Sequence, residues 1–526
     1  MQKQRQPAKK SLNIINFVRG CEPRVEMDLV LPVQKHMESM KQYGLKGTFL
    51  YQYDALLRED MVLPAMENRD CFEFGGWLEI VQPMVEAAGI PWRGRFPWDY
   101  HPHVGFTVGY TYEQRKALID VYMEKFRQVF GCYPKVMGSW MIDGRSLRYL
   151  EKYGIEAVCI CRDQCGTDGY NLWGGYYNHG FYPSENNMLC PAQSEETQVN
   201  IPVFRMLGSD PLYQYDAGLS ESFEPTDWQP VMTLEPVCGQ GGGDPQWVKW
   251  YLEENFKHDD LGFQYTQAGQ ENSFAWDEVG TPMQKQYAMF ADYREQGLMD
   301  VETLGETGRW FRQTYAVSPA CTMAFQNDWR HNKEQTFWYY NRFYRVNFHM
   351  QDDKLWIRDW QCFDDRYTER YYHDVETTTS CFYDNLPIID GFCFSGNSVR
   401  CGGYLVDEAG DTLSINPGSV QPSYDEETGV FTLLCQDNNG QSLKIVCNEQ
   451  GMTIQAEKSF AIKIRIGKMR DTEITDIAEN AVTFVHQQYL YQLHCLNGFA
   501  RQIDQGIALY PQEQYLQIAC KGIGKK

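Results

Sequence analysis

Hydrophobic and polar positions repeat one pattern from residue 12 to about residue 310: an apolar β-rich run, a loop, and an amphipathic stretch of helical length. The apolar runs predict strands at residues 12–20, 45–56, 71–80, 134–143, 156–164, 230–237, 261–267 and 299–304. The amphipathic stretches predict helices at 25–44, 110–131, 146–154, 245–256 and 282–297, the second opening on a capping box of Thr111 and Gln114. Seven or eight such strand–helix units favour an α/β fold, a (β/α)7-8 barrel, over an open sheet.

The pattern changes after about residue 310. Residues 336–364 alternate polar and aromatic positions in β fashion, and from about residue 385 short strands are separated by turn signals such as "DEAGD" and "QDNNGQ". These features predict a barrel domain over 1–310, an aromatic-rich junction over 311–384, and an antiparallel β-sandwich over 385–526. The rings of "FWYYNRFYRVNF" (337–348) recur with period two, so we expect them to pack the junction between the domains.

Composition narrows the class of partner. The formal net charge is −22, with 70 acidic against 48 basic residues, so the overall field repels phosphate backbones and anionic lipid. We therefore expect no nucleic-acid partner. No apolar run is long enough to span a membrane, and the N-terminus lacks a signal-peptide core. The 17 scattered cysteines are typical of free thiols, which predicts a cytoplasmic protein.

Aromatic residues are abundant, with 14 Trp and 34 Tyr in the chain. Rings often line sugar-binding clefts, because a ring face packs on the apolar face of a pyranose. The ring-rich, glycine-rich loop over 163–182 predicts such a cleft; its rings are Tyr170, Trp173, Tyr176, Tyr177, His179 and Tyr182. At the strand and loop just before and into this segment, Cys159, Cys161 and Cys165 lack the spacing of a zinc site, so no metal is predicted there.

The N-terminal part resembles a known family. The order "NFVRGCE", "MKQYGLKGTF", "FEFGGW" and "YPKVMGSWMIDGRSLRYLEKYGIEAV" is similar to the barrel shared by NodB-type polysaccharide deacetylases and by glycoside hydrolases of the family 57 type. The resemblance covers about residues 12 to 310. It implies a carbohydrate-active enzyme whose site lies at the carboxyl ends of the barrel strands.

Departures from the family separate its two branches. The deacetylases carry an Asp-Asp pair after the first strand and a His-x-x-x-His motif after the third, and together these hold a metal. This chain has "RGCEPR" at the first position and "EFGGWLEI", without histidine, at the second. The sequence therefore favours glycoside hydrolysis over metal-dependent deacetylation, and it predicts no metal or cofactor.

The glycosidase branch needs two carboxylates across the scissile bond. In the family 57 type these follow the fourth and seventh strands, and by strand count the resemblance assigns Asp143 and Glu271. The family has Glu and Asp in the opposite order, so the division of roles stays open. Gln270 and Asn272 flank Glu271 with amides that can bind sugar hydroxyls or hold the carboxylate, and Phe274 and Trp276 follow. Asp143 also suits the N-cap of the helix that follows it.

Other acids compete with Asp143 as the partner of Glu271. They are Glu22, which has Arg19 and Arg24 nearby, Glu73 and Glu79 around "FGGW", Glu235 before a glycine-rich loop, and Asp168. The residues predicted to contact substrate are Glu22, Glu73, Trp77, Glu79, Asp99, His101, His103, Trp140, Asp168, Trp173, Gln267 and Gln270.

The sequence thus predicts a metal-independent glycosidase acting on oligosaccharides. A carbohydrate deacetylase or esterase with the same barrel, and a glycan-binding protein without a working acid pair, are the alternatives. A homo-oligomer is compatible with the sequence. The sugar, the linkage, retention or inversion, and the role of the sandwich are left open.

Overall fold

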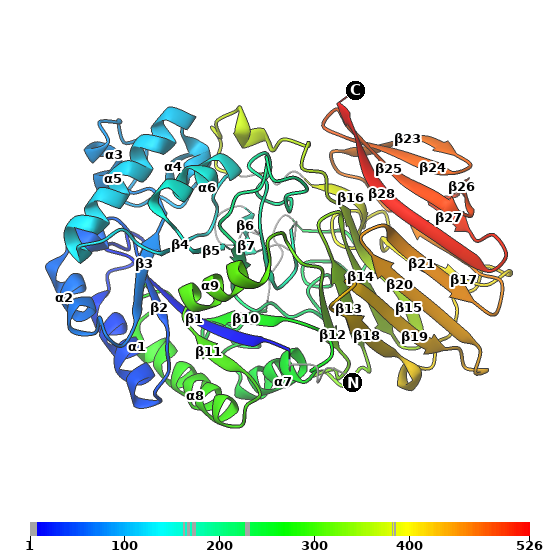
Figure 1. The fold of residues 1–526 in the computed structure, drawn as a ribbon, viewed down its shortest axis with the longest axis horizontal. Helices are drawn as coiled ribbons and strands as arrows, with labels where there is room; N and C mark the ends of the chain where they lie inside the picture. Colours follow the sequence, from blue (N-terminus) through cyan, green and yellow to red (C-terminus); the bar gives the residue numbers. More distant parts are fainter. Residues whose placement is uncertain are drawn as a thin grey trace.

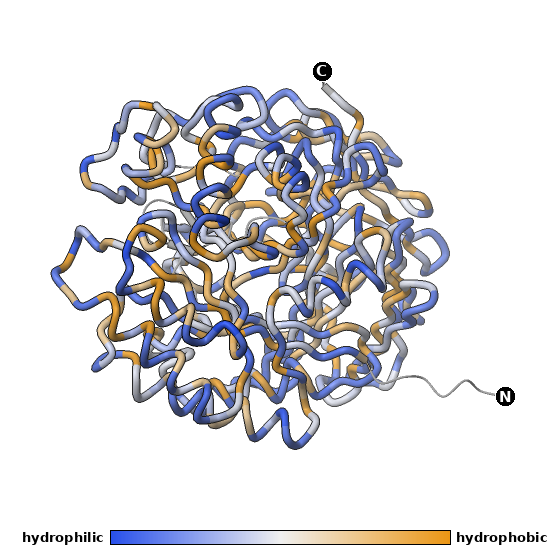
Figure 2. The backbone as a smooth tube through the Cα atoms, turned by 60° about the vertical axis from the view of Figure 1, so that its left-hand side comes forward, coloured by the Kyte–Doolittle hydropathy of each residue, from blue (hydrophilic) through white to orange (hydrophobic). Residues whose placement is uncertain are grey.

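The computed structural model describes residues 8–160, 164–165, 169–170, 175–226, 232–380, 382 and 385–525. The chain passes from an α/β barrel, coloured blue to green in Figure 1, to two antiparallel sheets, coloured yellow-green to red. Along the tube in Figure 2, hydrophilic loops lie at the periphery and hydrophobic stretches run through the interior. Among the described helices, none has both the length and the apolar composition that a bilayer crossing requires.

The barrel is built on one nearly closed sheet with parallel neighbours, except for its last strand. Its strands run in the order β10 (Gln264–Ala268), β1 (Lys10–Val18), β2 (Thr48–Tyr51), β3 (Glu73–Trp77), β4 (Val136–Ser139), β5 (Ala157–Ile160), β9 (Val203–Arg205) and β8 (Gly180–Phe181), and β11 (Asp300–Glu302) also pairs with β1. Among the described strands of this barrel sheet, only β8 runs antiparallel to its neighbour. The (β/α)7-8 prediction is confirmed.

Helices cover the outside of this sheet. They are α1 (Val30–Gln42), α2 (Glu59–Glu67), α3 (Gln82–Ala87), α4 (Pro102–Gly105), α5 (Tyr112–Phe130), α6 (Gly144–Leu150), α7 (Pro245–Phe256), α8 (Trp276–Glu295) and α9 (Leu304–Thr314). The predicted capping box is present at the start of α5, where Thr111 and Gln114 each bond the other's backbone N–H.

One predicted strand is wrong. Residues 232–237 form no strand, and the sixth parallel strand is instead β9, only three residues long. The predicted segment contains Pro230 and Pro236, which cannot donate to a sheet ladder. The number of parallel barrel strands that precede β10 is the predicted one, so β10 is still the seventh parallel strand.

The remaining strands form two antiparallel sheets. The first has the order β12 (Cys321–Phe325), β13 (Gln335–Tyr340), β14 (Tyr344–Gln351), β15 (Lys354–Cys362), β17 (Gly402–Val406), β22 (Ala461–Arg465), β27 (Gly506–Tyr510) and β26 (Phe499–Ile503), with β16 (Leu386–Asp390) on β15. The second has the order β18 (Gln421–Asp425), β19 (Val430–Gln436), β20 (Ser442–Asn448), β21 (Gly451–Ala456), β28 (Tyr515–Lys525), β25 (Tyr489–Asn497), β24 (Ala481–His486) and β23 (Thr472–Ala478). The predicted sandwich is present. Its first sheet includes β12 to β15, so the predicted junction over 311–384 supplies strands of the sandwich.

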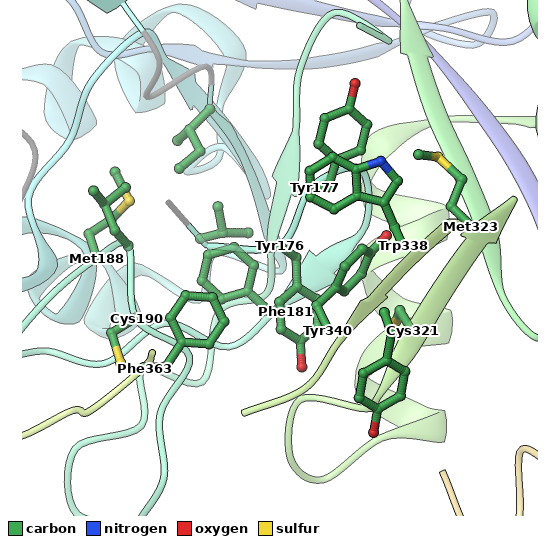
Figure 3. Close-up of a cluster of buried hydrophobic side chains, with 14 of the residues drawn as sticks. Tyr176, Tyr177, Phe181, Met188, Cys190, Cys321, Met323, Trp338, Tyr340 and Phe363 are labelled. Atoms are coloured by element: carbon green, nitrogen blue, oxygen red, sulfur yellow. The ribbon is translucent and has the colours of Figure 1, made fainter. Parts of the chain in front are cut away.

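Rings of β13 join the two domains, as the alternation over 337–348 predicted. Trp338 stacks on Tyr177 with ring centroids 4.2 Å apart, and Tyr340 lies 4.8 Å from Tyr176. Figure 3 shows these rings facing one another between the barrel loops and β13. Residues Phe337 to Tyr340 are fully buried.

The sugar cleft predicted over 163–182 is therefore wrong for its described rings. Tyr176, Tyr177, His179 and Tyr182 are buried at this junction, and the ring of His179 packs against Tyr340 and Phe263. Asp168 and Trp173 lie outside the described residues, and so does the side chain of Tyr170.

Candidate functional site

A cavity of about 250 Å³ lies at the carboxyl ends of the barrel strands. Arg19 comes directly after β1, Glu79 two residues after β3, Trp140 directly after β4, and Glu271 three residues after β10. The rest of the lining comes from loops: Arg24, Trp98, Tyr100, Phe106, Glu235, Val237 and Phe274. This is the edge of a parallel barrel where ligands bind.

Glu271 reaches the cavity because the chain turns at a glycine. Gly269 has φ of 130°, and a Cβ there would lie 1.8 Å from the carbonyl oxygen of Ile15. No other residue type fits that position without moving β1. The backbone N–H of Gln270 then donates to Asn16 Oδ1 (3.2 Å), which ties the turn to the neighbouring strand.

Arg19 is the central cation of the cavity. Its Nη1 lies 2.8 Å from Glu271 Oε2 and its Nη2 lies 3.2 Å from Glu79 Oε1. Burial opposes the charge of this guanidinium, but Glu271 and Glu79 outweigh that effect and raise its pKa. The guanidinium also lies over the ring of Trp98, 4.2 Å from the centroid. All three charged side chains are at most 8% exposed.

The amides beside Glu271 hold the backbone rather than face the cavity. Asn272 Oδ1 accepts from the backbone N–H of Arg19 (2.8 Å), and Asn272 Nδ2 donates to the Arg19 carbonyl (3.0 Å). Gln270 is fully buried, and its Oε1 accepts from the backbone N–H of Glu271 (2.8 Å). Of the two predicted roles for these amides, the structure supports the one that holds Glu271 in place over the one that binds sugar hydroxyls. Both position the Arg19–Glu271 pair.

Glu79 and Ser273 complete the support. Gln52 Nε2 donates to Glu79 Oε2 (2.9 Å), so both oxygens of this fully buried carboxylate are bonded. Burial raises the pKa of Glu79; Arg19 opposes the rise and the charge of Glu271 adds to it. Ser273 Oγ donates to Glu271 Oε1 and accepts from Arg19 Nη1 (3.3 Å).

Glu235 is the carboxyl of the cavity that contacts no cationic side chain within the described part of the chain. Its carboxyl accepts a hydrogen bond from Thr233 Oγ1 (3.3 Å). Burial, with the charge of nearby Glu271 adding to it, raises the pKa of Glu235 to about 8. At neutral pH this carboxyl therefore carries a proton, whereas Glu271 is held by its ion pair with Arg19.

Asp143 lies elsewhere. Its carboxylate caps α6 by accepting from the backbone N–H of Ser146 (2.9 Å), forms a buried ion pair with Arg115 Nη1 (3.0 Å), and accepts from Thr107 Oγ1 (2.7 Å). It lines a separate cavity of about 20 Å³ beside Glu369. The structure supports the N-cap interpretation of Asp143, and it brings Glu235, not Asp143, to Glu271.

Two further predicted contacts with substrate are contradicted by burial or position. Trp77 is fully buried and stacks on Phe17 with centroids 4.3 Å apart, so it lies beneath the cavity. Glu73 is at the opposite end of β3, where it accepts from the backbone N–H of Gly305 (3.0 Å) at the start of α9. Trp140, by contrast, lines the cavity as predicted.

The remaining predicted residues stand around the site without lining the cavity. Glu22 pairs with Arg24 (2.8 Å), and Arg24 does line the cavity. Asp99 pairs with Arg95 (2.9 Å) and with His101 Nδ1 (2.7 Å), and Asp99 and His101 are the two sequence neighbours of the cavity-lining Tyr100. His103 lies next to His101, with ring centroids 5.9 Å apart. Gln267 is buried within β10, and its Oε1 has no hydrogen-bond partner.

Sequence reasoning gave no functional role to Arg19 or Tyr100. Arg19 had a signal, because a cation directly after the first strand stands at the ligand-binding edge. Tyr100 had a weaker one, since "PWDYHPH" reads as an ordinary polar loop.

The donors present do not fit the metal of the deacetylase branch. Among the described residues no group of three or more His, Cys, Asp or Glu side chains is arranged to hold a metal ion. The cavity offers carboxylates alone, and Arg19 stands between two of them.

Comparison with solved structures places the fold. A Parabacteroides distasonis protein provisionally assigned as a glycoside hydrolase/deacetylase matches with a TM-score of 0.51 and 15% identity, over 68% of this chain and 86% of its own. A Mycobacterium smegmatis protein provisionally assigned as a polysaccharide deacetylase (TM-score 0.36, 11% identity) covers 59% of this chain and 93% of its own. A family 57 branching enzyme from Thermococcus kodakaraensis (TM-score 0.32, 11% identity) covers 59% and 71%.

No family model matches the sequence, and the search of curated proteins finds no match. The first of the structural matches carries the assignment of fold, since the other two have low TM-scores. The N-terminal part of this chain therefore has the barrel fold of a structure described as a glycoside hydrolase/deacetylase, the kind of barrel that the sequence resemblance predicted.

Proposed function

We propose that this protein is a carbohydrate-active enzyme that hydrolyses glycosidic bonds, with Glu235 as general acid and Glu271 as nucleophile or general base. The observation that carries the proposal is the contrast between the two carboxyls. Glu235 has a pKa of about 8 and contacts no cation among the described residues, whereas Glu271 is paired with Arg19 at 2.8 Å. Glycoside hydrolysis uses one carboxyl that donates a proton and a second carboxyl, held in place, that acts as nucleophile or base.

The chemistry follows from these states. Glu235 gives its proton to the glycosidic oxygen as the bond to the anomeric carbon breaks, so the leaving group departs as an alcohol. The carboxylate of Glu271 either attacks the anomeric carbon or takes a proton from the water that attacks it. Positive charge that develops on the sugar ring is stabilised by the carboxylate of Glu271, which lines the cavity.

Arg19 and Glu79 act on Glu271 rather than on the substrate. The guanidinium fixes one oxygen of Glu271 and Ser273 holds the other. Glu79 and the ring of Trp98 fix the guanidinium in turn. Such a support restricts the carboxylate to one geometry, which is how a catalytic group is preorganised.

A sugar substrate is supported by the wall of the cavity. The rings of Trp98, Tyr100, Phe106, Trp140 and Phe274 contribute to its lining, and the cavity is near the lower end of the size range of small-ligand sites. The barrel is also of the type found in a structure assigned to the glycoside hydrolases and deacetylases.

The test is hydrolysis of a broad panel of aryl glycosides by the wild type and by two single variants. Glu271→Gln should lower kcat by at least about 10³-fold on every substrate that the wild type accepts. Glu235→Gln should lower it strongly for poor leaving groups and weakly for dinitrophenyl glycosides, which need no proton. Equal loss for all leaving groups in Glu235→Gln, or unchanged turnover in Glu271→Gln, would contradict the assigned roles.

A further inference from the structure

A second and larger cavity, of about 760 Å³, lies between the barrel and the sandwich. One wall comes from the start of α7 and carries Trp250; the facing wall comes from the loop between β12 and β13, over residues 326–335, and carries Trp329. Pro417 and Gly418 close one side. We call this cavity the junction groove, and we propose that it binds an oligosaccharide chain.

Two indole rings form the apolar surface of the groove. Trp250 and Trp329 are both half-buried, with ring centroids 6.4 Å apart and an angle of 51° between their planes. Their N–H groups are already used, since Trp250 Nε1 donates to the Asn327 carbonyl (2.8 Å) and Trp329 Nε1 donates to Asp210 (2.9 Å). The rings are therefore held in place, and what remains for a ligand is carbon surface. That surface suits the C–H face of a pyranose.

The loop that carries Trp329 is built around a buried carboxylate. Asp328 accepts from the backbone N–H groups of Arg330 (2.8 Å) and Asn332 (2.8 Å) and from the hydroxyl of Tyr213 (2.7 Å). Two residues of the loop, His331 and Lys333, have positive φ values of 59° and 64°, a conformation that non-glycine residues rarely adopt. This backbone strain is held by the Asp328 bonds and presents His331 and Lys333 along the rim.

Polar groups with spare hydrogen-bonding capacity lie beside the rings. Gln335 donates through Nε2 to the Pro417 carbonyl (3.3 Å), but its buried Oε1 has no partner. Gln246, His331 and Lys333 are exposed where they line the groove. An unsatisfied buried amide oxygen is costly, and a sugar hydroxyl is a donor of the right size to satisfy it.

The chemistry of the groove favours a neutral sugar over the other ligands of similar length. A phosphate-bearing chain would meet the field of a molecule with net charge −22, and the carboxyls of Asp244 and Asp328 in the lining. A purely apolar ligand would leave Gln335 and the rim groups unpaired. Sugar-binding sites commonly combine aromatic rings with amide groups, and the volume of the junction groove is large enough for several sugar residues of an oligosaccharide.

The junction groove is separate from the cavity of Glu235 and Glu271, since no lining residue is shared. Binding in it does not rest on the proposed catalysis. It gives the contact between barrel and sandwich a role in holding carbohydrate.

Isothermal titration of the full chain tests the proposal, with neutral hexasaccharides of glucose, xylose, mannose and N-acetylglucosamine as probes. At least one should bind, and Trp250→Ala and Trp329→Ala should each weaken that binding by about tenfold. Trp92→Ala is the matched control, because this indole lines neither cavity. The hydrolysis of a small aryl glycoside should be unchanged in all three variants.

Substitutions at exposed positions of the groove provide a second test in case a tryptophan variant does not fold. The double variant Gln246→Ala with Lys333→Ala removes two exposed rim groups and should weaken the same binding by about threefold. Absence of binding by every hexasaccharide would overturn the proposal. An affinity that none of the groove variants changes would also overturn it, because the sugar would then be held elsewhere. Loss of catalysis in Glu271→Gln with sugar binding intact would separate this proposal from the proposed function.

Discussion

Arg19→Met removes the cation that contacts both Glu79 and Glu271. The two ion pairs, at 3.2 Å and 2.8 Å, join side chains that are at most 8% exposed. Removing one partner of a buried ion pair costs about 3–5 kcal/mol, because the other charge is left without compensation. Loss of the contact with the Trp98 ring adds about 1 kcal/mol. We therefore expect a destabilisation of about 4–6 kcal/mol near neutral pH.

The pH dependence of this destabilisation shows whether its origin is electrostatic. Burial and the charge of Glu271 raise the pKa of Glu79, and Arg19 opposes that rise, so without Arg19 this pKa lies further above its unfolded value of about 4.3. The folded state then binds more protons than the unfolded state, so stability is greatest at low pH and falls as pH rises through the raised pKa of Glu79. The penalty should be clearly smaller at about pH 5 than at about pH 8.

Chemical denaturation followed by intrinsic fluorescence measures both quantities. Arg19→Lys keeps the charge and should lose less stability, whereas Arg309→Met breaks only the half-exposed pair with Glu156 and should cost less than about 1 kcal/mol. An Arg19→Met protein that is as stable as the wild type at about pH 8, or equally destabilised at both pH values, would refute the reasoning.

Three further predictions concern the residues around Glu271. The acid role of Glu235 requires its proton, so in a pH–rate profile kcat should be level just below pH 8 and fall above it, as Glu235, with its pKa of about 8, loses that proton. The Glu235→Gln variant should lack this alkaline fall. Asp143→Ala removes a helix cap and the partner of buried Arg115, so denaturation should show a loss of about 3–5 kcal/mol, while kcat per folded molecule stays near the wild-type value. Gly269→Ala places a Cβ 1.8 Å from the Ile15 carbonyl oxygen, which should displace Glu271 and lower kcat far more than it changes KM; equal changes in both would argue against a positioning effect.

The sequence predicts the barrel well because its signals are local. Apolar runs mark β1 and β2, and a capping box marks the start of α5. The period-two alternation in β13 reflects the two faces of that strand, both of which are buried. The β9 strand was missed because three residues, "VFR", are too few for a periodic signal. Residues 230–237 were mistaken for it because their apolar content outweighed their two prolines.

The site was only half predictable for a different reason. Glu271 is recognisable from its polar loop after a strand, and Glu235 was named among the competing acids. The choice between Glu235 and Asp143 depends on contacts between distant segments, such as the pairing of Asp143 with Arg115. In the same way, the rings of Tyr176 and Tyr177 are buried only because Trp338 and Tyr340, in another domain, cover them.

The central claim is that Glu235 and Glu271 cleave glycosidic bonds. Its most direct test is to incubate the wild type and Glu271→Gln with a panel of partly acetylated oligosaccharides, and to measure new reducing ends and free acetate in the same samples. We predict that the wild type releases reducing ends without acetate, and that Glu271→Gln releases neither. Release of acetate without new reducing ends would contradict the claim and assign the barrel to deacetylation.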